Sequence, residues 1–176
     1  MKIIIVYESN NGHTEQMANA MAEGAGTVVG ADVVVKPAHE VVSDDLSRAD
    51  GIALGSPTHM GSMGWQMKKL IDEVFSGLWM KDVLVGKAGA VFGTGGSGGT
   101  GGAELCMLGM LTNLAENGLV LVTHPKNTEG FKPDGMHWGP TCATGRGDQG
   151  PKEAHLNAAK AHGKRLAEVS GLLIKN

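Results

Sequence analysis

Short runs of apolar residues recur along the chain, and segments with helical periodicity separate them. The runs lie at residues 3–7, 51–54 and 88–92, with weaker ones at 33–35 and 119–122. A run that is apolar at every position, rather than at alternate positions, is typical of a strand covered on both faces of a parallel sheet. The pattern therefore predicts five parallel strands with helices above and below them.

The segments between the runs carry their apolar residues at helical spacing. Residues 14–25 and 66–75 each place an apolar stripe on one side of a helix, and residues 152–170 do so with charged residues opposite. Residues 105–115 are apolar nearly all round, which indicates a deeply buried helix or a face used in self-association. The alternation of strands and helices predicts a single doubly wound α/β domain over residues 1–176.

Composition and charge narrow the range of partners. The 176 residues include 28 glycines and two cysteines, and the formal net charge is -3. This slightly acidic balance lacks the basic footprint of a protein that binds nucleic acids or membrane surfaces. No apolar stretch approaches the length of a membrane span. Two distant cysteines, Cys106 and Cys142, predict a reducing, cytoplasmic compartment.

Ligands of doubly wound sheets bind beyond the carboxyl ends of the strands, so the loops after the strands are where chemistry is expected. The loop after the first strand reads Ser9, Asn10, Asn11, Gly12, His13 and Thr14, directly before a helix. Free backbone N–H groups and the positive end of the helix dipole make such a loop an anion site. Because the loop has no lysine or arginine, it suits one phosphate monoester better than a triphosphate. Ordinary capping of the helix is the alternative.

Two further loops follow the third and fourth strands and are rich in small residues. Residues 55–64 contain glycines and a proline that would let backbone amides approach a flat ligand, although an ordinary long turn would look the same. Residues 93–102 match the dinucleotide pattern G-x-G-x-x-G, but a tract this rich in glycine does so by chance, and its backbone donors suit the rim of a planar polar ring. One phosphate site and two rims predict flavin mononucleotide (FMN) in a sheet of strand order 2-1-3-4-5.

The connection at residues 123–151 is longer than a compact domain normally contains. It includes His137, Trp138 and several prolines and glycines. Such a segment predicts either a functional flap or a contact between subunits.

The residues of these loops resemble those of a known family. Residues 6–18, VYESNNGHTEQMA, are similar to the phosphate loop of flavodoxin-like proteins. Residues 55–63, GSPTHMGSM, followed by Gln66, Met67, Asp72 and the stretch GLW at 77–79, resemble the WrbA-type NAD(P)H:quinone oxidoreductases. The likeness runs on through residues 86–87, 91–92, 114–115 and 118 into the last helix. It implies a flavodoxin-like fold over nearly the whole chain.

The resemblance also implies FMN as cofactor, NAD(P)H as hydride donor, a quinone as acceptor and a homo-oligomer as the working form. Carried over by position, Ser9 to Thr14 would hold the phosphate, and Trp79 would form one wall of the substrate pocket. The residues along the flavin ring would be Pro57, Thr58, His59, Met60, Gly61, Thr94, Gly95, Gly96, Ser97, Gly98 and Gly99. No metal is expected.

Two features of the chain bear on the chemistry. A histidine that the family commonly has before the glycine of the fifth strand is replaced, since the chain reads Glu116-Asn117-Gly118. Glu116, or His137 from the long connection, would then take the role of that histidine. The loop after the fourth strand offers glycine, serine and threonine but no aromatic ring to cover the flavin, which predicts one open face.

Two other functions remain open. An electron carrier of the flavodoxin type would dock to redox proteins, although its usual strongly acidic surface is not matched by a net charge of -3. A flavin-binding interaction protein would bind FMN without catalysis. Of the remaining residues, Cys106 is expected in the core, and His155 and His162 are expected as one surface and one packed residue rather than as metal ligands.

Overall fold

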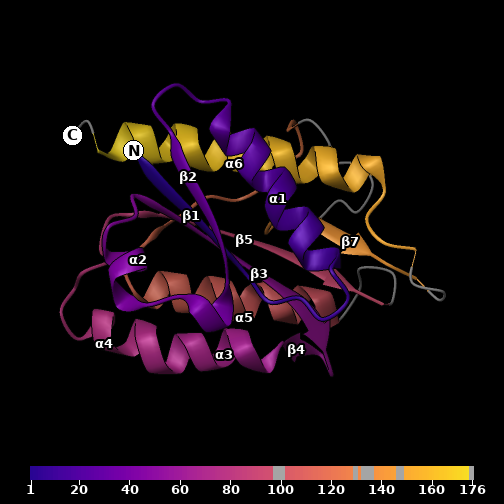
Figure 1. Ribbon diagram of the computed structural model, residues 1–176, viewed down its shortest axis with the longest axis horizontal. Helices are drawn as coiled ribbons and strands as arrows, with labels where there is room; N and C mark the ends of the chain where they lie inside the picture. Colours follow the sequence, from indigo (N-terminus) through magenta and orange to yellow (C-terminus); the bar gives the residue numbers. More distant parts are fainter. Residues whose placement is uncertain (97–101, 129–130, 132–136, 146–148, 175–176) are drawn as a thin grey trace.

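A parallel β-sheet runs through the centre of the protein (Figure 1). The computed structural model describes residues 1–96, 102–128, 131, 137–145 and 149–174. The long strands are β1 (Lys2–Tyr7), β2 (Asp32–Pro37), β3 (Gly51–His59) and β5 (Ala88–Gly95), in the order β2-β1-β3-β5. A short strand, β4 (Ser62–Met63), folds back antiparallel onto the end of β3. The order predicted for the first four parallel strands is confirmed.

Helices cover both faces of the sheet, as the apolar runs predicted (Figure 1). On one face lie α1 (His13–Gly26) and α6 (Glu153–Leu173). The other face carries α5 (Gly102–Glu116) and a continuous helical stretch made of α3 (Trp65–Leu70), the π-helical η2 (Ile71–Phe75) and α4 (Ser76–Trp79). The short η1 (Ala38–Glu40) and α2 (Ser43–Ser47) add to this second layer.

Alternate side chains of β1 enter different cores, which explains why every position of the run is apolar. Ile3 and Ile5 pack with α1 and α6, whereas Ile4 and Val6 pack with the layer of α3 and α5. All four are at most 3% exposed. A polar side chain at any of these positions would lose its water without gaining a partner, so the pattern follows from the two-sided cover.

The predicted fifth strand is also present next to β5, but it is short and shares this edge of the sheet with a second short strand. The run at 119–122 forms a strand of two residues, β6 (Val120–Leu121), which pairs with the first residues of β5. A second short strand, β7 (Thr141–Ala143), pairs with the last residues of β5. Most of the long connection therefore runs between β6 and β7, which both pair with β5, and its residues 141–143 belong to the sheet.

Two further expectations are settled by packing. Cys106 is fully buried, as predicted, and burial raises the pKa of its thiol to about 11. His155 and His162 are both buried, which corrects the expectation of one surface residue; His155 turns inward because its Nδ1 accepts a hydrogen bond from the Lys152 N–H at 3.0 Å. Among the described residues, no helix has the length and hydropathy needed to cross a membrane.

Candidate functional site

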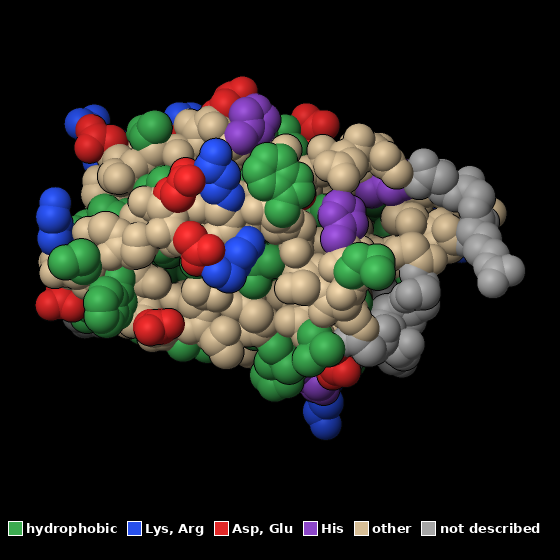
Figure 2. Space-filling model, turned by 90° about the horizontal axis from the view of Figure 1, so that it is seen from below, with side chains coloured by type: hydrophobic (Ala, Val, Ile, Leu, Met, Phe, Trp, Pro, Cys, Tyr) green, Lys and Arg blue, Asp and Glu red, His purple; other side chains and the backbone are tan. Residues whose placement is uncertain are grey.

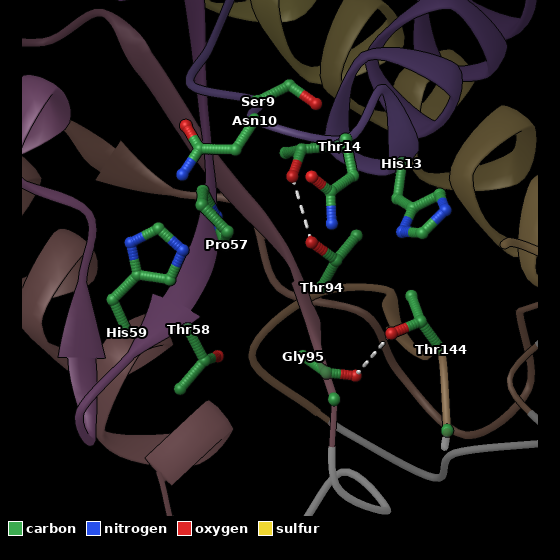
Figure 3. A pocket seen from close by; sticks show the side chains of 13 residues that line it. Ser9, Asn10, His13, Thr14, Pro57, Thr58, His59, Thr94, Gly95 and Thr144 are labelled. Carbon is green, nitrogen blue, oxygen red and sulfur yellow. Dashed lines mark hydrogen bonds between the residues drawn. The ribbon is translucent and has the colours of Figure 1, made fainter. Parts of the chain in front are cut away.

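A cavity of about 480 Å³ opens at the carboxyl ends of β1, β3 and β5 (Figure 3). Three segments far apart in the sequence meet there because parallel strands end at the same edge of the sheet. The described residues that line it are Ser9, Asn10, Asn11, His13, Thr14, Pro57, Thr58, His59, Thr94, Gly95, Gly96, Thr144 and Gly145. Its volume lies within the range of ordinary cofactor pockets, about 300 to 1,000 Å³.

The first segment is the loop between β1 and α1. It turns into the helix at Gly12, whose φ of 81° is a left-handed conformation that favours glycine. A glycine has no side chain with which to cap the helix, so the first-turn N–H groups of α1 are left to face the cavity. Ser9 adds a hydroxyl oxygen that is buried without a hydrogen-bond partner in the described part of the chain. Backbone donors, helix dipole and hydroxyl together form an anion site.

A buried hydrogen bond ties this loop to the end of β5. The hydroxyls of Thr14 and Thr94 lie 2.8 Å apart, and both residues are at most 4% exposed (Figure 3). The bond spans 80 positions of sequence. It holds the N-terminus of α1 and the end of β5 in one fixed arrangement.

The ends of β3 and β5 form two rims of the cavity. Pro57, Thr58 and His59 line one side, and Thr94 and Gly95 line the other (Figure 3). A side chain at Gly95 would press against Thr58, with a Cβ only 3.3 Å from the Thr58 Oγ1. Small residues are therefore needed where the two rims approach each other.

Two residues of the long connection at 123–151 complete the cavity, although the sequence did not identify them individually. The Thr144 N–H donates to the Gly95 carbonyl at 2.8 Å, and the Thr144 hydroxyl donates to the same oxygen at 3.3 Å. Thr144 and Gly145 directly follow β7. They line the cavity because β7 pairs with β5, which no local sequence pattern predicts.

A buried carboxylate supports the second rim from behind. Glu8 is 1% exposed, and its Oε2 accepts a hydrogen bond from the Met67 N–H at 2.8 Å, in the first turn of α3. Beside it, the Ser56 hydroxyl accepts from the Gly64 N–H at 2.8 Å. A Cβ at Gly64 would collide with the Glu8 carboxylate. These contacts hold the turn through β4 against the end of β1.

The chemistry of the lining limits what the cavity can hold. None of its described lining residues is Asp, Glu, Lys or Arg, and none is Phe, Tyr or Trp. An anion would therefore be held by backbone N–H groups and hydroxyls rather than by a cationic side chain. A flat ring between the two rims would have one face without an aromatic cover.

The structure brings most of the predicted cofactor residues together. Gly12 sits at the start of α1, outside the lining itself. Met60 and Gly61 form the tip of the turn between β3 and β4 and have positive φ angles of 49° and 81°, but they do not line the cavity. Ser97, Gly98 and Gly99 lie outside the described residues.

The structure does not bring the three predicted catalytic residues to the cavity. Trp79 ends α4, and Glu116 ends α5. Each lies at the far end of a helical stretch that starts beside the cavity, and about 15 helical residues span roughly 22 Å. Trp79 and Glu116 of one chain are therefore too far away to act there. His137 is exposed and contacts Phe131, with ring centroids 4.9 Å apart, outside the lining.

His137 borders a separate group of buried rings. The His124 N–H donates to the His137 carbonyl at 2.8 Å, and the rings of His124 and His162 meet edge to face at 5.2 Å. All four ring nitrogens of these two histidines are buried without a partner among the described residues. Burial lowers the pKa of His124 to about 4 and that of His162 to about 3, and the charge of Arg165 lowers both further. Over the described ranges, no group of three or more His, Cys, Asp or Glu could hold a metal ion.

Comparison with known proteins agrees with this geometry. The sequence profile of the family described as Flavodoxin matches residues 5–163. A protein from Geotalea daltonii named NAD(P)H dehydrogenase (quinone) is 34% identical, over 99% of this chain and 98% of its own. A protein of the same name from Geotalea uraniireducens is also 34% identical, over 99% of this chain and all of its own length, 100%.

Solved structures show the same fold. A flavodoxin, WrbA-like protein from Agrobacterium tumefaciens has a TM-score of 0.75 at 25% identity, covering 97% of this chain and 98% of its own. A flavodoxin from the domain Archaea has a TM-score of 0.71 at 28% identity, covering 97% of this chain and 99% of its own.

Proposed function

The chain belongs to the flavodoxin family, and from this premise we propose that it is an FMN-dependent NAD(P)H:quinone oxidoreductase. The observation that carries the proposal is the cavity itself, which joins the N-terminus of α1 to two small-residue rims and has no cationic or aromatic side chain among its described lining residues. The two Geotalea relatives that match almost end to end bear the name of this activity.

The residues present fit FMN. Its phosphate monoester would lie at the N-terminus of α1, where the buried Ser9 hydroxyl has no partner within the described chain. Its ring would lie between Pro57 to His59 on one side and Thr94 to Gly96 on the other. Thr144 fixes the Gly95 carbonyl and so holds the rim at the end of β5 in place.

When bound, FMN supplies a ring that accepts a hydride from NAD(P)H and delivers two electrons to a quinone. The overall reaction converts NAD(P)H, a proton and a quinone into NAD(P)⁺ and a hydroquinone. The protein would contribute orientation and access, because the lining at the ends of β3 and β5 would hold the ring by its edges and leave one face for nicotinamide and quinone in turn.

Binding is tested first with FMN and riboflavin, which differ by the phosphate. We expect the fluorescence of FMN to be quenched when FMN binds to the protein. Riboflavin should bind at least about tenfold more weakly, because it leaves the anion site empty. Equal affinity for the two flavins, or no binding of either, would contradict the assigned phosphate site.

Hydride transfer is tested by mixing the FMN-loaded protein anaerobically with NADH or NADPH. We expect rapid loss of the oxidised flavin absorbance and its return on addition of benzoquinone. Flavin that stays oxidised with both nucleotides would overturn the proposed activity.

The second candidate is a one-electron carrier that docks to redox proteins. The structural likeness to the archaeal flavodoxin, at 28% identity over 97% of this chain, favours it. The net charge of -3 and the uncovered ring face favour the oxidoreductase. A carrier would leave NADH and NADPH unoxidised yet exchange single electrons with a dithionite-reduced partner protein, whereas a flavin-binding protein without catalysis would do neither.

A further inference from the structure

A second hollow adjoins the flavin cavity beside α3. It lies on the side of the molecule where Figure 2 shows hydrophobic, acidic, basic and histidine side chains next to one another. It has a volume of about 720 Å³ and is lined by residues of β4 and α3, among them Met63, Trp65, Lys68 and Lys69. We refer to it as the α3 groove. His59 lines both the groove and the flavin cavity, so the two spaces meet at this side chain.

The surface of the α3 groove offers apolar contact. Trp65 is the first residue of α3 and is 66% exposed, an unusual position for so large an apolar side chain. Met63 forms the floor, because it packs on the core below and its Cε would lie 3.0 Å from a Cβ at Gly109 of α5. Both side chains line the groove, and large apolar side chains gathered beside a cavity favour the binding of an apolar group.

The charged residues of the groove neutralise one another. Lys68 Nζ lies 2.5 Å from an Asp72 carboxylate oxygen, and Lys69 Nζ lies 4.0 Å from Glu73 Oε2. Both pairs are four residues apart and lie along the helix, so the aliphatic stems of the lysines add to the apolar wall. A diphosphate is held by cations or by free backbone N–H groups, and both lysines of the groove are already paired with carboxylates.

We propose that the α3 groove binds the hydrocarbon side chain of a quinone whose ring is reduced in the adjoining cavity. The substrates are then quinones that carry an aliphatic tail, rather than small quinones without one. This rests on the proposed oxidoreductase function and adds the substrate class. The continuity through His59 and the paired charges favour this occupant over the adenosine diphosphate half of NAD(P)H and over a second copy of the chain.

The kinetic test compares 2,3-dimethoxy-5-methyl-1,4-benzoquinone with its 6-decyl derivative, which has the same ring. We expect the FMN-loaded wild type to reduce the decyl quinone with a kcat/KM about tenfold higher, because burying even two or three methylene groups is worth that much. Trp65→Ala should bring the ratio of the two kcat/KM values close to one. Trp65→Leu, which keeps an apolar side chain, should retain most of the wild-type preference for the decyl quinone.

Leu172→Ala is the matched control, since Leu172 is a large exposed side chain, 63% exposed, on α6 and outside the groove. It should keep the wild-type ratio. Equilibrium dialysis of the oxidised protein with each quinone, without NAD(P)H, measures the two dissociation constants. It therefore reports the same preference without turnover.

The outcomes separate the groove from the activity. If the protein reduces no quinone but binds the decyl quinone more tightly in a Trp65-dependent way, the proposed function fails and the groove stands. If both quinones are reduced and bound equally well, the tail site is overturned and the function stands. The tail site is also overturned if Trp65→Ala leaves the ratio unchanged and instead raises the KM for NAD(P)H, or dissociates an oligomer.

Discussion

Individual polar groups in and directly behind the cavity are of two kinds, and only one of them serves the fold. The Ser56 hydroxyl holds the backbone of Gly64, and the hydroxyls of Thr14 and Thr94 hold each other. The Ser9 hydroxyl is buried and bonded to nothing in the described chain. A buried polar group without a partner costs stability unless a ligand satisfies it, so we predict that a bound ligand forms a hydrogen bond with Ser9.

This difference predicts opposite effects for two serine to alanine changes. Ser9→Ala should leave the unfolding free energy of the flavin-free protein within about 0.5 kcal/mol and weaken FMN binding about tenfold, because the hydrogen bond exists only with ligand. Ser56→Ala should lower the unfolding free energy by about 1 to 3 kcal/mol, because the Gly64 N–H stays buried without an acceptor. Urea denaturation and FMN titration measure both. A Ser9→Ala protein that loses stability like Ser56→Ala but binds FMN normally would contradict the assignment.

The buried histidines set the behaviour of the protein in acid. In the folded state, burial keeps His124 and His162 neutral, with pKa values of about 4 and 3, while the unfolded chain takes up protons near pH 6.5. The groups around them, His137 and Arg165, add positive charge and oppose protonation further. Below pH 6.5 the unfolded state therefore binds more protons than the folded state.

We predict that the free energy of unfolding is insensitive to these residues above pH 7 and falls as the pH drops from about 6.5 towards 4. Each histidine contributes a slope of up to about 1.4 kcal/mol per pH unit. His162→Leu should reduce the slope by up to that amount, and His39→Gln, at an exposed histidine of η1, should not. Urea denaturation from pH 4.5 to 7.5 measures the slopes. Identical slopes for wild type and His162→Leu would rule out this origin of the acid sensitivity.

At the level of elements, the close approach of α1 and α6 depends on two glycines. A Cβ at Gly24 of α1 would collide with the backbone carbonyl of Lys160, and a Cβ at Gly163 of α6 would collide with that of Met21. Helices pack this closely only where one of them lacks a side chain at the crossing point. The contact matters for the site because α1 also carries the anion-binding N-terminus.

Gly24→Ala and Gly163→Ala should each lower the unfolding free energy by about 3 kcal/mol, because backbone cannot move aside as a flexible side chain can. Gly77→Ala is the control: Gly77 lies in α4 with open space around its Cα, so alanine there should raise stability by about 0.5 to 1 kcal/mol. Chemical denaturation gives all three values. If Gly24→Ala lowers the unfolding free energy no more than Gly77→Ala does, the two helices are farther apart than described.

At the scale of the whole molecule, the sheet edge that holds the cavity lies at one end, and an exposed apolar segment lies at the other. Trp79, Met80 and Val85 follow one another around the end of α4 and are 51%, 79% and 60% exposed. Large apolar side chains gathered on a surface mark contacts with other molecules. This segment is where the self-association implied by the family resemblance would form.

We predict that the protein sediments as a multiple of the single-chain mass. Met80→Lys should shift it towards the monomer by placing a charge in the contact. Val29→Lys, at a valine that is 97% exposed in the turn after α1, should leave the mass unchanged. Analytical ultracentrifugation distinguishes these results. A wild-type protein that sediments as a single chain would contradict the predicted homo-oligomer.

The sequence alone determined the parts of the protein whose structure is local. Residues 3–7 could be identified as a buried strand and residues 9–14 as the loop that leads into the first helix, because apolar periodicity and the chemistry of a helix N-terminus act over a few neighbouring residues. The doubly wound arrangement followed from the same alternation. The ends of β1, β3 and β5 then had to meet, since parallel strands share an edge.

Tertiary structure decided whatever depends on pairing and distance between remote segments. Thr144 reaches the cavity because β7 pairs with β5 across a long connection, and two residues of β6 alone give no hint of this. Trp79 and Glu116 have suitable chemistry, but a helix of about 15 residues carries each of them away from the cavity. The α3 groove likewise exists only because the turn through β4 lies beside α3 in space. Sequence patterns specify which residues can do chemistry, and the packing of distant elements specifies which of them meet.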